Sequence, residues 1–173
     1  MQRVSLVAAV VGLGLALASC GYTLVGSSGG RALGRVVVET PENGSGSAGL
    51  EFVVAEALRR EVLRRAGAQL VDDEANADWV VTGRVLPLKV EPASLSPVVL
   101  TLEYQLSLSL DLHARARDGR EVTGSERELR ESERFLSSAD AEALRKNRSE
   151  ALRRVSSVLA ARFLDRLDEG QGG

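Results

Sequence analysis

The sequence has one cysteine, Cys20, and one histidine, His113, among its 173 residues. A lone cysteine cannot form an intramolecular disulfide, and it is too few for a cysteine-based zinc site. A lone histidine excludes a histidine metal cluster, and a Ser-His-Asp triad would require it to lie at the right place. There is also no G-x-S-x-G motif and no phosphate-binding glycine loop. We therefore expect no catalytic residue, no metal site and no enzymatic activity.

Strong charge of one sign is also absent. The formal net charge is -2, which is too balanced for a general nucleic-acid-binding protein. Lysine occurs only at Lys89 and Lys146, and all other basic residues are arginine. The arginine bias is interpreted first as genome composition and only second as phosphate recognition.

The longest apolar run, Val4 to Leu17, is too short for a comfortable membrane span and follows the basic residue Arg3. This pattern is typical of an export signal. It ends in Leu17-Ala18-Ser19-Cys20, which resembles the lipobox of bacterial lipoproteins, whose leader is cut before an acylated cysteine. An ordinary signal peptide with an incidental thiol is the alternative. We predict a signal peptide at 1–19 and a lipidated, flexible tether at 20–34.

The lipobox resemblance implies that Cys20 carries an S-diacylglycerol and an N-acyl chain, palmitate among the acyl groups, with no other cofactor. Each buried methylene contributes roughly 0.8 kcal/mol, so several acyl chains would hold the protein firmly to a bilayer. Gly21 follows the cysteine where lipoproteins retained in the inner membrane of enteric bacteria tend to carry Asp. The expected location is therefore the periplasmic side of the outer membrane.

The first half of the mature chain predicts a strand and a helix. The β-branched run at 35–40 ends at Pro41 and predicts a strand, and a small-residue loop follows. Apolar residues at three- and four-residue spacing predict a helix over 50–66, with Ser47 as its N-cap and Gly67 just after its end.

Three further strands are expected after the helix. They are a valine-rich strand at 79–86, a strand at 100–112 and a fourth strand running from Arg120 toward Phe135 after the Asp118-Gly119 hairpin turn. The prolines of 87–97 predict a loop between the first two. Strict alternation of leucine with polar residues in 100–112 places His113 on the polar face, exposed.

The fourth strand changes parity between Val122 and Phe135, which predicts a bulge near Gly124. Its many charges, Glu126, Glu128, Glu131 and Glu133 among them, suggest a protected edge strand in preference to an acid-base pair. A second helix should follow a capping box formed by Ser137 and Asp140. Residues 170–173 are expected to be disordered.

This order predicts an α+β fold, a two-layer sandwich with two helices on one face of a four-stranded mixed sheet. The order of elements is β-α-β-β-β-α, and one domain spans 35–169. The opposite face of the sheet should be polar, either wetted or placed against a polar wall of another protein.

Several short motifs, in this order, resemble the LptE family of lipopolysaccharide-assembly lipoproteins. They are Cys20-Gly21-Tyr22-Thr23-Leu24, Ala77-Asp78-Trp79-Val80-Val81, Glu103-Tyr104-Gln105-Leu106 and Glu133-Arg134-Phe135. The resemblance implies a lipoprotein that plugs a large outer-membrane β-barrel of the LptD type and assists lipopolysaccharide assembly. It also implies contact with lipopolysaccharide, whose phosphates favour basic residues.

Arg84 and Lys89 are the candidate phosphate contacts, and Arg145, Lys146 and Arg148 form a second candidate group. Solvated surface charge is the alternative for both groups. A lipoprotein subunit of another envelope machine, such as a secretin pilotin or a lipid-transporter auxiliary, would fit the same pattern of elements. A periplasmic enzyme is the remaining alternative.

Overall fold

The computed structural model describes residues 33–95 and 101–170. The predicted leader, Cys20 and residues 171–173 lie outside this part of the chain. In chain order the elements are β1 (Gly34–Val38), β2 (Glu42–Asn43), α2 (Leu50–Arg64), β3 (Ala68–Leu70), the 3-10 turn η2 (Glu74–Asn76), β4 (Trp79–Val85), β5 (Lys89–Leu95), β6 (Thr101–Ala116), β7 (Glu121–Gly124), β8 (Arg130–Leu136) and α3 (Ala141–Glu169). Within the described residues, neither helix combines the length and hydropathy of a membrane span.

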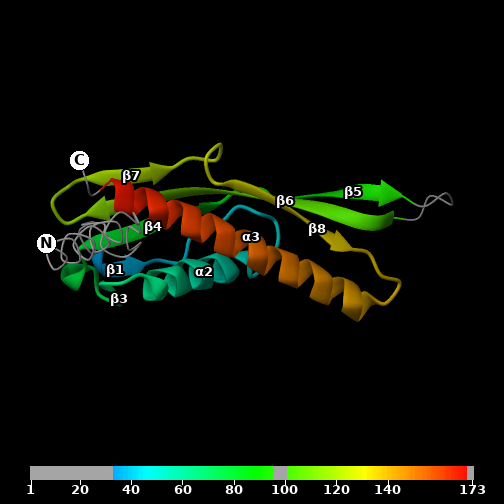
Figure 1. The fold of residues 1–173 in the computed structure, drawn as a ribbon, viewed down its shortest axis with the longest axis horizontal. Coiled ribbons are helices and arrows are strands. Elements are labelled where there is room, and N and C mark those ends of the chain that lie inside the picture. Colours follow the sequence, from blue (N-terminus) through cyan, green and yellow to red (C-terminus); the bar gives the residue numbers. More distant parts are fainter. Residues whose placement is uncertain (1–32, 96–100, 171–173) are drawn as a thin grey trace, which may run out of the picture. The chain divides into compact units, whose positions relative to one another are not determined.

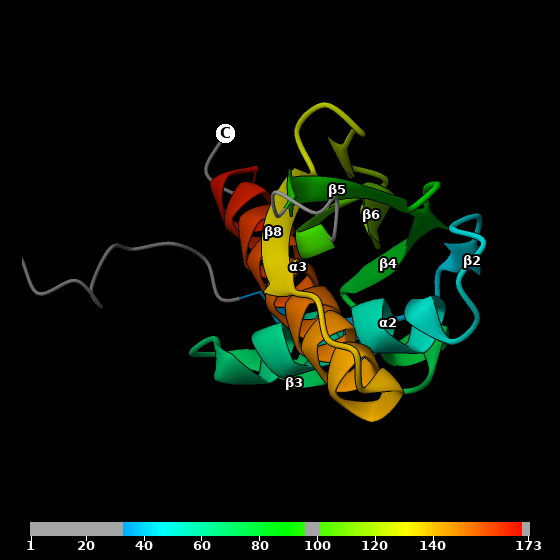
Figure 2. The ribbon, with the colours of Figure 1, turned by 90° about the vertical axis from the view of Figure 1, so that its right-hand side faces the viewer.

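The predicted α+β class and the mixed sheet are confirmed, and α2 and α3 lie together on one side of β4 and β6 (Figures 1 and 2). The predicted number of strands is wrong, because the sheet has eight strands in place of four. β6 explains the difference. Two short strands share each of its edges, β4 with β5 on one and β7 with β8 on the other.

The predicted loop at 87–97 is wrong, because Lys89–Leu95 forms β5, antiparallel to β6. Pro92 lies within this strand, opposite Tyr104. A proline is tolerated there because β5 pairs only with β6 among the described residues, so the missing N–H interrupts no second ladder. The register shifts after Pro92, so the pairing becomes irregular there but continues to Leu95.

The alternation predicted for the central strand holds along β6. Its even-numbered residues from Leu106 to Ala116 are buried against the helices, and together with Leu50, Leu58, Leu159 and Phe163 they belong to the main core. His113 is exposed on the opposite face, as predicted. A second, small cluster on that face, Val37, Ala77 and Val80 with Val71 against it, involves residues of the 71–77 segment.

The predicted bulge near Gly124 is a longer break, because β7 ends at Gly124 and β8 begins only at Arg130. Leu129 turns inward between them, is completely buried, and its carbonyl accepts a hydrogen bond from the N–H of Leu110. A Cβ at Gly124 would lie 2.4 Å from Leu129 Cδ1, so only glycine fits beside that side chain. The buried leucine accounts for the change of parity in the sequence.

Both predicted helix caps are wrong. The N-cap of α2 is Gly49, with φ of 82°, and no side chain caps it. The N-cap of α3 is Asp140, whose side chain accepts a hydrogen bond from the N–H of Glu142. Ser137 cannot be the cap, because its N–H still donates to the carbonyl of Leu102 and prolongs the strand pairing.

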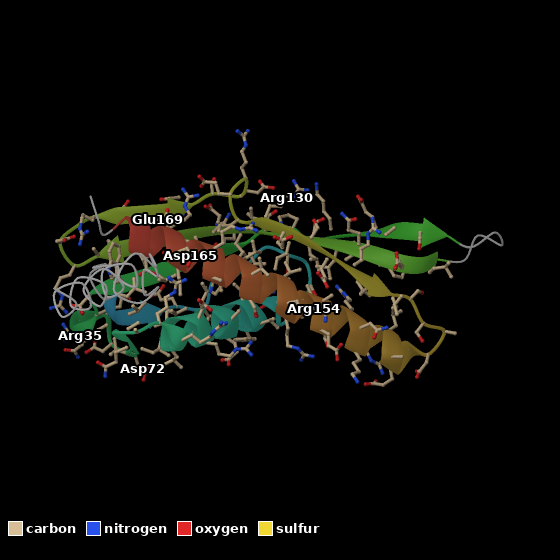
Figure 3. All side chains as sticks on the ribbon, in the orientation of Figure 1. Arg35, Asp72, Arg130, Arg154, Asp165 and Glu169 are labelled. Carbon is tan, nitrogen blue, oxygen red and sulfur yellow. The ribbon has the colours of Figure 1, made fainter. Side chains whose placement is uncertain are left out.

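Three ion pairs connect α3 to the edge of the sheet formed by β8 and the turn before it. Arg154 pairs with Glu133 at 2.8 Å, Arg162 with Glu131 at 2.7 Å and Arg166 with Glu128 at 2.8 Å. Figure 3 labels Arg154 on this helix. Among the described residues β8 pairs only with β6, so the predicted edge position is confirmed, and three of its expected glutamates pair with the helix that runs along this edge.

Arg65 connects the C-terminal ends of the two helices. Its guanidinium donates to the Asp165 carboxylate at 2.7 Å, to the Asp168 carboxylate, and to the carbonyl of Ala161 at 3.1 Å. Arg65 follows the last residue of α2, so α2 and α3 run parallel, with their C-termini at the same end of the domain. Its side chain is largely buried at this junction.

Ser156 of α3 is completely buried, and its Oγ has no hydrogen-bond partner. A buried hydroxyl without a partner costs folding free energy, so Ser156→Ala should raise the free energy of unfolding by about 1 kcal/mol. Urea unfolding of the two proteins measures the change. The control is Ser157→Ala, which removes an exposed hydroxyl bonded to its own helix and should change stability by less than about 0.5 kcal/mol. Equal effects of the two substitutions would contradict the prediction.

Asp78 accepts hydrogen bonds from the side chain and from the backbone N–H of Arg35, and these lower the pKa of its carboxyl to about 2. A lowered pKa stabilises the folded state above the ordinary value of 3.8, and this contribution disappears as the pH falls from there toward 2. Asp78→Asn should therefore be less stable than the wild type at pH 7, and the difference should shrink between pH 4 and 2. Thermal unfolding at several pH values tests this, and a constant difference across the range would disprove it.

Candidate functional site

Two surfaces of the described domain contain the residues singled out by the sequence. One is the helix-free face of the sheet, formed by the odd-numbered side chains of β6 and their neighbours on β4, β5 and β7. The other lies where the first turns of α3 diverge from the end of the sheet made by β5, β6 and β8 (Figure 1). We call this end the distal end.

On the helix-free face, His113 lies between Asp111 and Thr123. The Asp111 carboxylate is 3.4 Å from Nε2 of His113, and the Thr123 hydroxyl is 3.4 Å from its Nδ1. A nucleophile and its general base normally approach to about 2.6–3.2 Å, so this row is looser than an assembled triad. All three side chains lie open to solvent on a sheet surface. The row matches the exposed His113 that the sequence predicts.

A carboxyl pair lies near the same face. Glu39 follows β1, and a hydrogen bond with Glu74 raises the pKa of the Glu39 carboxyl, with burial and the charge of Glu74 acting in the same direction. Arg115 lies 4.0 Å from Glu74 and favours the ionised form. Glu39, Glu74 and Arg115 thus form a small group of charges beside η2. No local sequence pattern predicts this group, because its members come from three separate segments.

The structure places both Arg84 and Lys89 on the helix-free face, but apart from each other. Arg84 lies opposite Asp111 and Lys89 opposite Ser107, so about 13 Å of β6 separates them. Arg84 is ion-paired with Glu42 at 2.7 Å. Lys89 is exposed and forms no ion pair with any described carboxylate, and it begins β5 where a loop was expected. The two residues therefore do not form one phosphate-binding pair.

The second basic group lies on the first turns of α3. Arg145 is paired with Glu142 one turn earlier, and Lys146 is exposed. Arg148 makes only a 3.4 Å hydrogen bond to the Ser47 hydroxyl and has no carboxylate partner among the described residues. It differs from the other two because it also lines a cleft at the distal end.

This distal cleft is lined by Val90 of β5, Tyr104 of β6, Phe135 of β8, and Leu144 and Arg148 of α3, and its volume is about 320 Å³. The rings of Tyr104 and Phe135 stack with centroids 5.4 Å apart. Apolar side chains make up most of its walls, and the guanidinium of Arg148 supplies a positive charge. The cleft combines an apolar wall with a cation, which suits an amphiphile that has a hydrocarbon part and an anionic part.

The sequence did not predict the distal cleft, although Tyr104 and Phe135 lie in two of its family-like motifs. The alternation in 100–112 places Tyr104 on the core face, and Phe135 lies after the change of parity in the fourth strand, so neither residue indicated an open cleft. Val90 fell inside the expected loop, and nothing in the sequence indicated that α3 diverges from the sheet. The nearest signal was the cation group at 145–148 directly after apolar Leu144.

Comparison with solved structures finds lipoproteins of the same fold. The structure is similar to rare lipoprotein B from Shewanella oneidensis, with 15% identity, a TM-score of 0.51, and coverage of 78% of this chain and 94% of that one. It is also similar to lipoprotein B from Nitrosomonas europaea, with 12% identity, a TM-score of 0.56, and coverage of 88% and 94%. The hypothetical protein CT253 from Chlamydia trachomatis matches with 14% identity, a TM-score of 0.53, and coverage of 79% and 96%.

The comparison with curated protein sequences found no match. A family profile described as lipopolysaccharide-assembly, that of LptE, matches residues 33–167. This range includes all the helices and strands described above except the last two residues of α3. The family consists of non-enzymatic lipoproteins associated with the outer membrane. The chain belongs to the LptE family of lipopolysaccharide-assembly lipoproteins, as its short motifs suggested.

Proposed function

We propose that this protein is anchored to the outer membrane by acyl chains on Cys20, binds inside an LptD-type β-barrel, and holds lipopolysaccharide during assembly at the cell surface. The family match over residues 33–167 is the observation that carries the proposal. Cys20 precedes the described domain by 13 residues, so a tether of this length would connect the lipid anchor to Leu33.

The helix-free face supports the barrel partner. It presents Thr82, Arg84, Asp111, His113 and Thr123, which are hydroxyl, charged and imidazole groups that can exchange hydrogen bonds with a polar wall. The lumen of a large outer-membrane barrel is polar. A sheet face of this chemistry could lie against such a wall without burying unpaired groups, whereas the opposite face is sealed by both helices.

The distal cleft supports contact with lipopolysaccharide. Lipid A combines acyl chains with phosphate groups, and the cleft combines Tyr104, Phe135 and Leu144 with the guanidinium of Arg148. Arginine binds phosphate oxygens through two parallel hydrogen bonds, which makes it suited to this group. Lys146, two residues before Arg148 and also exposed, adds a second cation at the same end of α3. Arg84 and Lys89 remain candidates for phosphate contact on the helix-free face.

The partner is tested by purifying the lipidated protein from its native outer membrane in mild detergent. Mass spectrometry should then identify a large β-barrel at a stoichiometric amount, because a polar plug is held by an extensive surface and survives mild solubilisation. Both this protein and the control, an unrelated outer-membrane lipoprotein, carry the same affinity tag and are purified in the same way. A secretin or a transporter subunit in place of the barrel would move the protein to another envelope machine.

Ligand contact is tested with Arg148→Glu. Replacing the cation by an anion should weaken binding of purified lipopolysaccharide about tenfold, because a charge-assisted hydrogen bond to phosphate is lost. Equilibrium binding to the lipidated wild-type and variant proteins in the same detergent gives this ratio.

The matched control is Arg153→Glu, the same change on the exposed side of the same helix, which should leave binding unchanged. Dephosphorylated lipopolysaccharide provides a second control. The wild type should bind it about tenfold more weakly than the intact form, and Arg148→Glu should no longer distinguish the two. Equal losses for both arginine variants would refute the assignment of Arg148.

A further inference from the structure

The solvent-facing side of α2 carries two large apolar side chains that nothing in the described domain covers. Phe52 is 64% exposed and Leu63 is 63% exposed, whereas the other large apolar residues of this helix are buried or partly buried. They lie eleven residues apart, which is three helical turns, so both occupy one side of the helix about 17 Å apart. The helix thus has an inner apolar side that packs in the core and a second, outer pair of apolar side chains that is exposed.

The residues between them follow a regular spacing. Glu56 comes four residues after Phe52, Arg59 three residues later, and Leu63 four residues after that. Alternating steps of three and four residues are the spacing of side chains that meet a second helix along one seam. Arg60 flanks the seam and is ion-paired with Glu56 at 3.4 Å, with both side chains about half exposed. The outer seam of α2, residues 52, 56, 59 and 63 with Arg60 beside it, is apolar at both ends and charged in the middle.

We propose that the outer seam binds the same seam of a second copy of this chain, with the two α2 helices antiparallel about a two-fold axis. The pair Phe52 and Leu63 and the pair Glu56 and Arg59 have the same midpoint, between Ala57 and Leu58. An antiparallel copy centred there places Phe52 against Leu63 of the second copy, and Glu56 against Arg59 and Arg60 of the second copy. Each contact occurs twice, as two-fold symmetry requires.

Charge complementarity selects this occupant. An antiparallel copy brings the single acidic position of the seam onto its basic positions, whereas a parallel copy would set Glu56 against Glu56. The polar wall of a barrel lumen would leave Phe52 and Leu63 without apolar partners. Arg59 also donates to the carbonyl of Val38 at 2.9 Å, so its guanidinium is held beside the helix and loses little freedom on pairing.

The expected dimer is weak and depends on the membrane. One pair of four-turn helices buries less than the roughly 1,200 Å² of a stable complex. Anchoring through Cys20, which rests on the proposed function, would confine copies to one surface and raise their effective concentration. A barrel that encloses the domain leaves no room for a second copy on α2. The dimer therefore belongs to lipoprotein that has not yet bound a barrel.

The test uses the full lipidated chain in phosphatidylcholine vesicles that contain neither barrel nor lipopolysaccharide. An Arg153→Cys substitution supplies a thiol for donor and acceptor dyes, since the native cysteine is expected to be acylated. Energy transfer should exceed the value for random placement at the same surface density. Glu56→Arg introduces four like-charged contacts per dimer and Arg60→Glu introduces two, and each change should lower the association constant at least about fivefold.

Mixing the two charge-reversal variants provides the decisive test. Donor-labelled Glu56→Arg mixed with acceptor-labelled Arg60→Glu makes three of the four charge contacts across the seam attractive, so energy transfer should rise back toward the wild-type level. A misfolded variant could not give this rescue. Arg127→Glu, an exposed charge reversal outside α2, is the control and should leave energy transfer unchanged.

Energy transfer at the random level for the wild type, or no rescue on mixing, would overturn the dimer. These outcomes do not depend on the barrel or lipopolysaccharide tests, which succeed or fail separately. If the chain fails to float with vesicles, acylation is refuted, and the same energy transfer and mixing experiment in solution at high protein concentration decides the dimer.

Discussion

The length and strict alternation of β6 constrain the rest of the domain. The even-numbered side chains of this sixteen-residue strand form an apolar face, which the helices cover from Leu106 to Ala116. No single neighbouring strand matches this length, so β4 and β5 share one edge and β7 and β8 the other. Both helices are then forced onto the apolar side, with the long α3 crossing β7 and β8 as well. The polar face opposite is a direct result of the same alternation.

The sequence was informative wherever a single periodic pattern determined the structure. The alternation of β6, the apolar spacing of α2 and α3 and the valine-rich β4 all predict their elements, and the exposure of His113 follows from the parity of β6. The sequence failed where a tertiary contact decides. Pro92 suggests a loop, but an edge strand has an unused side on which a proline is harmless. Ser137 has the composition of a cap, but its N–H is held by strand pairing.

The candidate sites show the same limit. Arg84 and Lys89 are close in sequence, yet they lie about 13 Å apart along β6, and Arg84 is paired with Glu42. The distal cleft depends on the angle at which α3 leaves the sheet, which no local pattern encodes. Arginine content was attributed to genome composition or phosphate, but Arg65, Arg154, Arg162 and Arg166 are structural, because each connects a helix to another element. Their guanidinium groups offer donors in a rigid planar fork, a geometry that the ammonium group of lysine lacks.

The parallel arrangement of α2 and α3 has an electrical consequence. Each helix carries a partial positive charge at its N-terminus and a partial negative charge at its C-terminus, and side-by-side parallel dipoles repel. Arg65 lies between the two negative ends, where its guanidinium donates to the carbonyl of Ala161 and pairs with the carboxylates of Asp165 and Asp168. The N-termini of both helices point toward the distal end, and the greater length of α3 carries its positive end beyond that of α2. The backbone dipoles of both helices therefore favour an anion at the end that contains Arg148 over one at the end that contains Arg65.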